Sequence, residues 1–193
     1  MESSQKIMRI VSGFLKGKKI EFLKSKTTRP LRDFVKENIF NIMNHSNLIN
    51  IKLENANVLD LYSGVGSFGI ECISQGAKKS TFVENDNNAL ITLKKNLNNL
   101  NIGNQTEVFN GKITSFLNRF NNKVKFEIIF LDPPFAENFF LKELKIIKDA
   151  TIYKKNHLII IHREKKTKDD LEKIINIHST KIYGRSKVIF GYF

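Results

Sequence analysis

The chain has 193 residues, of which 41% are hydrophobic and 10% aromatic, so it can bury the core of one domain. A single cysteine, Cys72, excludes an internal disulfide and is typical of a reducing cytoplasm. No uncharged apolar run is long enough to span a membrane, and the first residues lack the apolar stretch of a signal peptide. The four histidines do not cluster. We therefore expect one cytoplasmic, metal-free domain over residues 1–193.

The net charge of +13 is unevenly distributed along the chain. Residues 1–37 carry ten lysines and arginines against four acids, and residues 154–193 carry the same numbers. Residues 38–153 are nearly neutral, with twelve basic and eleven acidic residues. Basic ends around a neutral middle favour a polyanionic partner, most commonly a nucleic acid, over a merely solvated lysine-rich surface. The predicted contacts at the N-terminal end are Lys16, Lys18, Lys19, Arg29 and Arg32.

Residues 8–12 and 18–22 predict two short strands joined through GFLKG, a basic hairpin within an extension of residues 1–30. Helical spacing follows at 33–44. From there strands alternate with helices. Strands are expected at 57–62, 79–84, 106–110, 126–132 and 157–162 and as a terminal pair around Gly184, and helices at 68–74 and 86–100. Over residues 31–193 this alternation predicts an α/β core with a mostly parallel, seven-stranded sheet and helices on both faces.

Residues 60–69, DLYSGVGSFG, contain the spacing Gly64-x-Gly66-x-x-Gly69 directly after a predicted strand. This turn and an acid twenty residues later, Glu84, fit the binding of NAD. Asp60 fits less well, because a carboxylate beside the loop would repel a pyrophosphate at the helix N-terminus. S-adenosylmethionine has no phosphate and carries an ammonium and a sulfonium. The acid therefore favours S-adenosylmethionine, although this glycine spacing alone is weak evidence.

Residues 128–138, IIFLDPPFAEN, end a buried strand with Asp-Pro-Pro-Phe. Two prolines and a packed phenylalanine could simply terminate the strand. A chemical interpretation uses every residue of the motif. The amine of a nucleobase is a poor nucleophile, and two acceptors aimed at its N–H bonds would favour attack on a methyl group. The Asp132 carboxylate and the Pro133 carbonyl can be these acceptors, and Phe135 can stack on an extruded base.

The glycine loop, the acid Glu84 and LDPPF together resemble Rossmann-like (class I) amino methyltransferases. The segments RIVSGFLKGKKI and TRPLRDFVKENIFNI resemble the start of the RsmD family, which methylates the N2 amine of a guanine in 16S ribosomal RNA. The resemblance runs from about Met8 to the final strand. It implies S-adenosylmethionine as cofactor and 16S ribosomal RNA, within a small-subunit assembly particle, as the partner of a monomeric enzyme.

The resemblance also implies roles for individual residues. The target guanine would be held by the catalytic residues Asp132, Pro133 and Phe135, and the cofactor by Asp60, Tyr62, Gly64, Gly66, Glu84 and Asn85. Within this set Glu84 would bind the ribose and Asn85 would lie beside the adenine. Two departures from the family pattern stand out. Leu31 and Arg32 follow Arg29-Pro30 where the family has threonine, and Lys112 replaces an acid near the adenine.

Three other functions stay open at this point. A DNA adenine-N6 methyltransferase shares DPPF, but 193 residues leave little room for its target-recognition domain. An NAD-dependent oxidoreductase would share the glycine loop, but Asp60 ahead of that loop and the DPPF motif both count against it. A non-catalytic RNA-binding assembly factor could use the same scaffold, although an intact Asp132 argues against it. Cytosine-C5 chemistry needs a nucleophilic cysteine, and Cys72 is expected to be buried within a helix.

Overall fold

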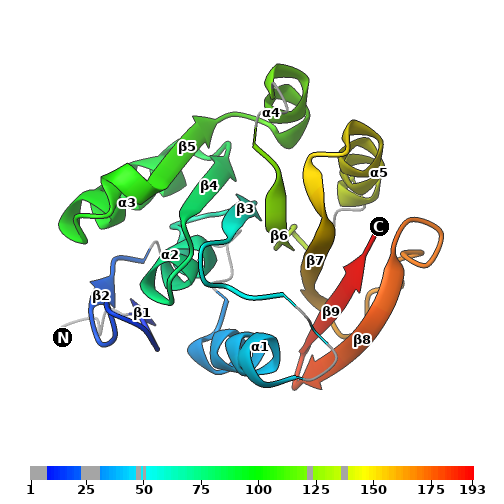
Figure 1. Ribbon diagram of the computed structural model, residues 1–193, viewed down its shortest axis with the longest axis horizontal. Coiled ribbons are helices and arrows are strands. Elements are labelled where there is room, and N and C mark those ends of the chain that lie inside the picture. Colours follow the sequence, from blue (N-terminus) through cyan, green and yellow to red (C-terminus); the bar gives the residue numbers. More distant parts are fainter. Residues whose placement is uncertain (1–7, 23–30, 47–48, 50, 121–123, 136–138) are drawn as a thin grey trace, which may run out of the picture.

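The computed structural model describes residues 8–22, 31–46, 49, 51–120, 124–135 and 139–193, and Figure 1 shows the sheet at its centre. The seven strands lie in the order β5-β4-β3-β6-β7-β9-β8. Five strands are parallel, and β9 runs antiparallel to both β7 and β8. Their bounds are β3 Asn57–Leu61, β4 Lys79–Glu84, β5 Thr106–Asn110, β6 Phe126–Leu131, β7 Tyr153–Glu164, β8 Asn176–Tyr183 and β9 Ser186–Tyr192. The predicted α/β class and mostly parallel seven-stranded sheet are confirmed.

Helices cover both faces of this sheet. The apolar residues of α1, α2 and α3 pack on one face, and those of α4 and α5 pack on the other. Asp86 caps α3, as its sequence suggests, by accepting a hydrogen bond from the Ala89 N–H at 2.8 Å. The helices are α1 Asp33–His45, α2 Ser67–Ser74, α3 Asn87–Asn99, α4 Ile113–Arg119 and α5 Phe140–Ala150, with a short 3₁₀ turn at Gly103–Gln105. Among the described residues, no helix is long and apolar enough to cross a membrane.

The strand order reverses between β3 and β6. From β3 the chain proceeds through β4 to β5 on one side, and then crosses to β6 and β7 on the other. Ligands of open α/β sheets bind outside the carboxyl ends of the strands at such a reversal. Asp60, Glu84 and Asp132 stand in or directly after the last residues of β3, β4 and β6. We call this edge of the sheet the carboxyl edge.

The N-terminal hairpin forms a separate two-stranded sheet beside α2 (Figure 1). Its strands, β1 Met8–Arg9 and β2 Lys19–Ile20, are shorter than the predicted 8–12 and 18–22. The reason is that the N–H groups directly after β1 bond to α2 and so do not extend the ladder with β2, although the turn also keeps hydrogen bonds of its own. The Glu71 carboxylate accepts hydrogen bonds from the N–H groups of Val11 and Ser12 at 2.9 and 2.8 Å, and Ser74 Oγ accepts one from Leu15 at 3.0 Å.

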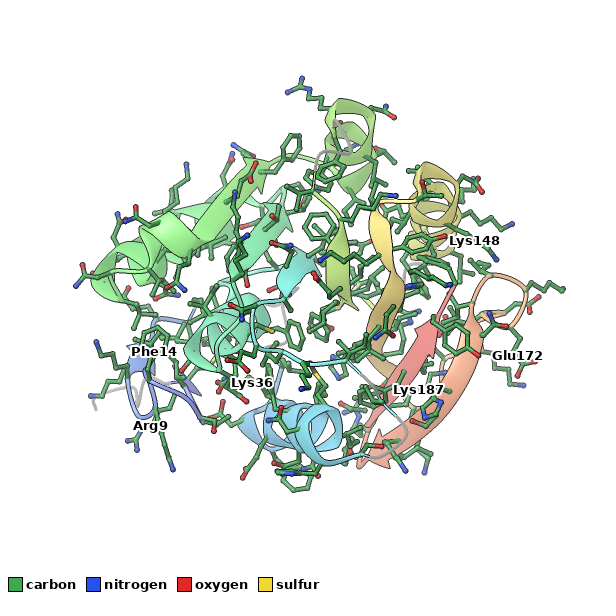
Figure 2. The ribbon with its side chains drawn as sticks, viewed as in Figure 1. Arg9, Phe14, Lys36, Lys148, Glu172 and Lys187 are labelled. Carbon is green, nitrogen blue, oxygen red and sulfur yellow. The ribbon has the colours of Figure 1, made fainter. Side chains whose placement is uncertain are left out.

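A fully buried lysine joins the hairpin, α1 and α2. Figure 2 labels Lys36 on α1, where this helix faces α2. Its Nζ donates to the carbonyl of Arg9 at 2.9 Å and to Ser67 Oγ at 3.3 Å, and it lies 3.3 Å from the Glu71 carboxylate. Both Lys36 and Glu71 are fully buried. Because Ser67 begins α2, this contact places the first turns of α1 at the carboxyl edge.

The C-terminal strands differ from the prediction in extent. β7 runs over 153–164 instead of 157–162, so His157 and His162 lie within the strand and not at its ends. The terminal hairpin around Gly184 is present, and its first strand begins at Asn176. β9 pairs with β7, which leaves β8 at the edge of the sheet.

Candidate active site

The glycine loop connects β3 to α2 at the carboxyl edge. Gly64 and Gly66 both have positive φ, +55° and +87°, a backbone conformation that favours glycine. A Cβ on Gly66 would lie 2.4 Å from Leu93, and one on Gly69 would lie 2.4 Å from Phe82. The first glycine therefore shapes the turn, and the other two let α2 pack closely on its neighbours.

Asp60 is buried beneath this loop, and its Oδ2 accepts a hydrogen bond from the Gly69 N–H at 2.9 Å. Burial raises the pKa of this carboxyl well above its usual range, and the nearby charges of Asp132 and Glu84 raise it further against the opposing hydrogen bond from Gly69. Three carboxyl groups thus meet where β3, β4 and β6 end. Such a site favours a cationic ligand over a pyrophosphate, in agreement with the reasoning from sequence.

The Glu84 carboxylate is held by three backbone N–H groups. Its Oε2 accepts from Gly64 at 2.7 Å, and its Oε1 accepts from Asn85 and Asp86, both at 2.8 Å. A carboxylate can accept about four hydrogen bonds, so one acceptor position remains on Oε2. The side chain therefore fixes the glycine loop against the end of β4 and still has capacity for a ligand hydroxyl.

The remaining predicted cofactor residues, Tyr62 and Asn85, directly follow β3 and β4. Tyr62 adopts a left-handed backbone with φ +60°, and its hydroxyl donates a hydrogen bond to Glu143 of α5. Asn85 is exposed directly after Glu84. The Gly111 N–H donates to the Glu84 carbonyl at 2.9 Å, which brings the exposed Lys112 next to the predicted ribose site. Cys72 is buried within α2 as expected.

The Asp-Pro-Pro-Phe segment forms the loop after β6, which we call the DPPF loop. The Asp132 side chain is 18% exposed, and its Oδ1 lies 2.8 Å from Nδ1 of His162. The Phe135 ring meets the His162 ring edge-on, with centroids 5.6 Å apart. Nε2 of His162 is buried without a hydrogen-bond partner among the described residues. The three predicted catalytic residues are therefore contiguous with a buried histidine of β7.

Arg163, the next residue of β7, is also fully buried and lies against the backbone of the DPPF loop. Its guanidinium donates to the carbonyls of Pro134 at 2.9 Å and Phe135 at 3.2 Å, with a long 3.5 Å contact to Pro133. Two further bonds of 3.1 and 3.0 Å go to the Asp169 carboxylate. The arginine stacks over the ring of Phe140, with Cζ 4.5 Å from its centroid.

The counterion of this arginine is held as an anion. Burial works to raise the pKa of the Asp169 carboxyl. Hydrogen bonds from Arg163 and Thr167 and the charges of Arg163 and Lys187 together outweigh it, and the pKa lies below its ordinary value. Figure 2 labels Lys187 on β9, and its Nζ is 3.7 Å from the Asp169 carboxylate.

The predicted RNA-binding residues are not gathered in one place. Lys16, Lys18 and Lys19 are exposed on the hairpin, and the turn that carries Lys16 packs on the carboxyl end of α2, away from the glycine loop. Arg32 is exposed just before α1, whose first turns lie at the carboxyl edge. Arg29 lies outside the described residues.

Sequence reasoning missed His162 and Arg163. Their only signal was a pair of polar residues at the end of an apolar run, which is typical of any strand end. Fold and site together define a Rossmann-like class I methyltransferase fold with three carboxyl groups at the strand-order reversal. The sequence also matches the protein family described as conserved hypothetical protein 95 over residues 8–192.

A curated relative supports the same grouping. Ribosomal RNA small subunit methyltransferase D of Haemophilus influenzae is 36% identical over 160 residues, which cover 82% of this chain and 79% of the relative. The chain belongs to this family, the RsmD family, as the resemblance of its N-terminal segments indicated.

Solved structures agree in fold. The candidate methyltransferase yhhF of Escherichia coli superposes with a TM-score of 0.78 at 26% identity, covering 96% of this chain and 97% of its own. A candidate SAM-dependent methyltransferase of Streptococcus mutans superposes with a TM-score of 0.62. At 15% identity, and with 79% of this chain and 48% of the other covered, that second likeness is one of fold alone.

Proposed function

We propose that the chain transfers a methyl group from S-adenosylmethionine to the exocyclic N2 amine of a guanine in 16S ribosomal RNA. The observation that carries the proposal is the position of Asp132. Its partly exposed carboxylate follows β6 at the strand-order reversal, beside the buried acids Asp60 and Glu84. The name of the Haemophilus influenzae relative supports ribosomal RNA as the substrate. The N-terminal segments support guanine.

The residues present fit the proposed cofactor. Gly64 has nothing within 4 Å of the position of a Cβ, so the loop backbone is open to a ligand on that side. The remaining acceptor position on Glu84 suits a ribose hydroxyl, and the carboxyl groups suit a ligand with positive charge. Ser63 Oγ is buried without a partner among the described residues. When bound, S-adenosylmethionine supplies an electrophilic methyl group and leaves as a neutral thioether.

The DPPF loop would receive the target amine. Oδ1 of Asp132 is bonded to His162, which leaves Oδ2 for one N–H, and the Pro133 carbonyl can accept the other. Two such acceptors favour a pyramidal nitrogen and offset the positive charge that develops during attack. The nitrogen lone pair would form the new N–C bond to the methyl group that the bound cofactor would supply, and the electron pair of the broken bond would stay with the cofactor. One N–H proton leaves to the Asp132 carboxylate, and Phe135 stacks on the base.

Basic and aromatic residues at the carboxyl edge suit the adjoining single-stranded RNA. The Phe34 ring is 62% exposed and meets the Tyr183 ring edge-on, 5.9 Å between centroids. Exposed bases stack on such rings, and cations neutralise the phosphates. Arg32 precedes α1, and the Lys165 N–H donates to the Arg185 carbonyl at 2.8 Å, which places two exposed cations together. This surface adds to the hairpin lysines as a proposed RNA contact.

Methylation assays on the purified protein test the proposal. Wild type and Asp132→Ala would be incubated with labelled S-adenosylmethionine and either naked 16S ribosomal RNA or small-subunit particles, and the RNA digested to nucleosides. We expect N2-methylguanosine from the wild type, and a rate on the order of 100–1000-fold lower for Asp132→Ala. The affinity of Asp132→Ala for the cofactor should change little, because the carboxylate acts on the amine.

The same assay, run in parallel with DNA as the substrate, separates the alternatives. Label in N6-methyladenine of DNA would identify a DNA methyltransferase, and RNA binding without any label would identify an assembly factor. NAD binding with an affinity comparable to that of S-adenosylmethionine would contradict the interpretation of Asp60. Comparison of N2-methylguanine in ribosomal RNA from cells with and without the gene then locates the target nucleotide.

A further inference from the structure

Two consecutive residues of β7 hold the DPPF loop from opposite faces of the sheet. Side chains of neighbouring strand residues point to opposite faces. His162 lies on the face of α1 and α2 and reaches the Asp132 carboxylate at 2.8 Å. Arg163 lies on the face of α5 and reaches the carbonyls of Pro134 and Phe135. The contact of His162 therefore fixes a side chain of the loop, and the contacts of Arg163 fix its backbone.

We propose that His162 and Arg163 are positioning residues for methyl transfer, which set the orientation of Asp132 and the shape of the DPPF loop before the substrate binds. This inference rests on the proposed function. His162 occupies Oδ1 of Asp132 and so determines that Oδ2 faces the amine. Arg163 fixes the backbone that presents the Pro133 carbonyl. The two proposed acceptors of the amine are thus each oriented by one of these residues.

The contacts of Arg163 suit positioning. Prolines lack N–H groups, so the two prolines of the DPPF loop cannot donate backbone hydrogen bonds that would tie it to the strands. The rigid fork of a guanidinium can instead bond several carbonyls at once in a fixed planar geometry, with donors on separate nitrogens that the single nitrogen of a lysine does not provide. Asp169 holds the fork in place through two bonds. The loop is therefore ordered through its carbonyl groups, from a strand thirty residues away.

The contact of His162 with Asp132 is also more than packing. The Asp132 carboxylate can only accept, so Nδ1 of His162 donates their hydrogen bond, and Nε2 is buried without a partner among the described residues. An unpaired buried polar nitrogen costs stability. His162 thus directs its Nδ1 donor at the Asp132 carboxylate, which is proposed to bind the amine, at the cost of leaving its other nitrogen unpaired among the described residues.

The first test replaces His162 in the full-length protein. His162→Phe keeps a ring but removes the donor, and His162→Asn restores a donor near the position of Nδ1. We expect His162→Phe to lower kcat by about 10–100-fold, the scale of a misplacement near 1 Å, with KM for RNA and the Kd of S-adenosylmethionine changed less than about threefold. His162→Asn should recover most of the lost kcat.

His157 provides a matched control on the same strand. It is buried, bonds the Lys154 carbonyl and the Phe193 N–H, and lies nearer than His162 to the amino end of β7, away from the DPPF loop. His157→Phe should lower the thermal midpoint without lowering kcat of the folded enzyme. Equal losses of kcat in the two phenylalanine variants would show that stability, and not positioning, explains the effect.

The second test addresses Arg163. Arg163→Met removes all of its hydrogen bonds, and Arg163→Lys keeps the charge without the fork, so the lysine variant serves if the methionine variant does not fold. We expect faster hydrogen exchange over residues 128–135 in the absence of any substrate, and a fall in kcat of about 10–100-fold. The proposal is overturned if the wild type methylates RNA and both Arg163→Lys and His162→Phe keep kcat within about twofold of it.

The exchange measurement also separates two failures. A wild type that methylates no RNA refutes the proposed function. Unchanged hydrogen exchange over residues 128–135 in Arg163→Lys refutes the proposal that Arg163 fixes the DPPF loop, whatever reaction the protein performs.

Discussion

Replacing Glu84 by glutamine should release the glycine loop from β4 and weaken cofactor binding together. The carboxylate accepts from Gly64 on one oxygen and from Asn85 and Asp86 on the other. Glutamine keeps one oxygen. If that oxygen faces Asn85 and Asp86, the amide NH₂ faces the Gly64 N–H, and two donors oppose each other. The charge-assisted bond to Gly64 is lost in this arrangement.

The magnitude follows from the bonds lost. A hydrogen bond to a charged group contributes about 1.5–3 kcal/mol, so the free energy of unfolding in urea should fall by that amount. The proposed ribose contact uses the same oxygen, and its loss should lower the affinity for S-adenosylmethionine by about 1–3 kcal/mol, or 5–150-fold in calorimetry.

Glu107→Gln is a suitable control on the neighbouring strand. Glu107 is exposed and pairs with Lys79 at 2.7 Å, and exposed pairs contribute about 0–1 kcal/mol. Glu107→Gln should change neither the free energy of unfolding in urea nor the affinity for S-adenosylmethionine appreciably. Wild-type affinity in Glu84→Gln would refute the reasoning, because it would mean that the cofactor does not depend on this carboxylate or on the loop that it holds.

Three other expectations follow from the buried charges and the basic surface. Lys36→Met leaves Glu71 buried without its cation and should cost about 3–5 kcal/mol in urea unfolding, whereas the exposed Lys94→Met should cost little; a loss below about 1 kcal/mol would contradict the role of Lys36. Burial raises the pKa of Asp60 above its ordinary value of 3.8. The stability that protonated Asp60 contributes to the folded protein is therefore fully present below pH 3.8, and it is lost as the pH rises through the pKa of Asp60 in the folded state. Asp60→Asn should therefore be more stable than wild type at pH 7.5, a difference that shrinks on acidification, and should bind S-adenosylmethionine more weakly; a less stable Asp60→Asn at pH 7.5 would be evidence against this. Neutralising Lys16, Lys18 and Lys19 together should flatten the slope of log affinity for RNA against log salt by roughly two units if all three contact phosphate; an unchanged slope would assign these charges to solubility and RNA recognition to Lys165, Lys166 and the C-terminal end.

The sequence was sufficient where local pattern determines structure. The turn of Gly64 and Gly66 requires positive φ, and glycine is the residue that adopts it at low cost, so the spacing indicated a loop before a helix. Apolar runs predicted β3, β6 and β7, because central strands buried on both faces are nearly continuous in hydrophobicity. Since carboxyl ends of parallel strands share one edge, the grouping of Asp60, Glu84 and Asp132 followed from the strand assignments alone.

What the sequence could not supply depended on contacts between distant segments. The hairpin strands are short because Glu71 and Ser74, about sixty residues away, take the N–H groups that a longer hairpin would pair internally. Nothing near Val11 in the sequence indicates this competition. The position of Lys16 follows from the same docking, since the turn that carries it is bonded to the far end of α2.

The DPPF loop shows why a motif can be found when its support cannot. Asp132 to Phe135 are adjacent, and their chemistry can be judged from four letters. Arg163 acts on the same loop only because β6 and β7 pair in parallel, with Leu131 opposite Ile161, so that the next residues of both strands emerge side by side. Parallel pairing needs a long crossover and leaves no local signal of register. A buried arginine is costly unless the donors that its carboxylate partner leaves free are also bonded. The DPPF loop, whose prolines lack N–H groups but retain their carbonyls, supplies those acceptors. Arg163 thus orders the DPPF loop, and the carbonyls of the loop accept hydrogen bonds from the buried arginine. This mutual dependence can be recognised only once the pairing of β6 with β7 is known.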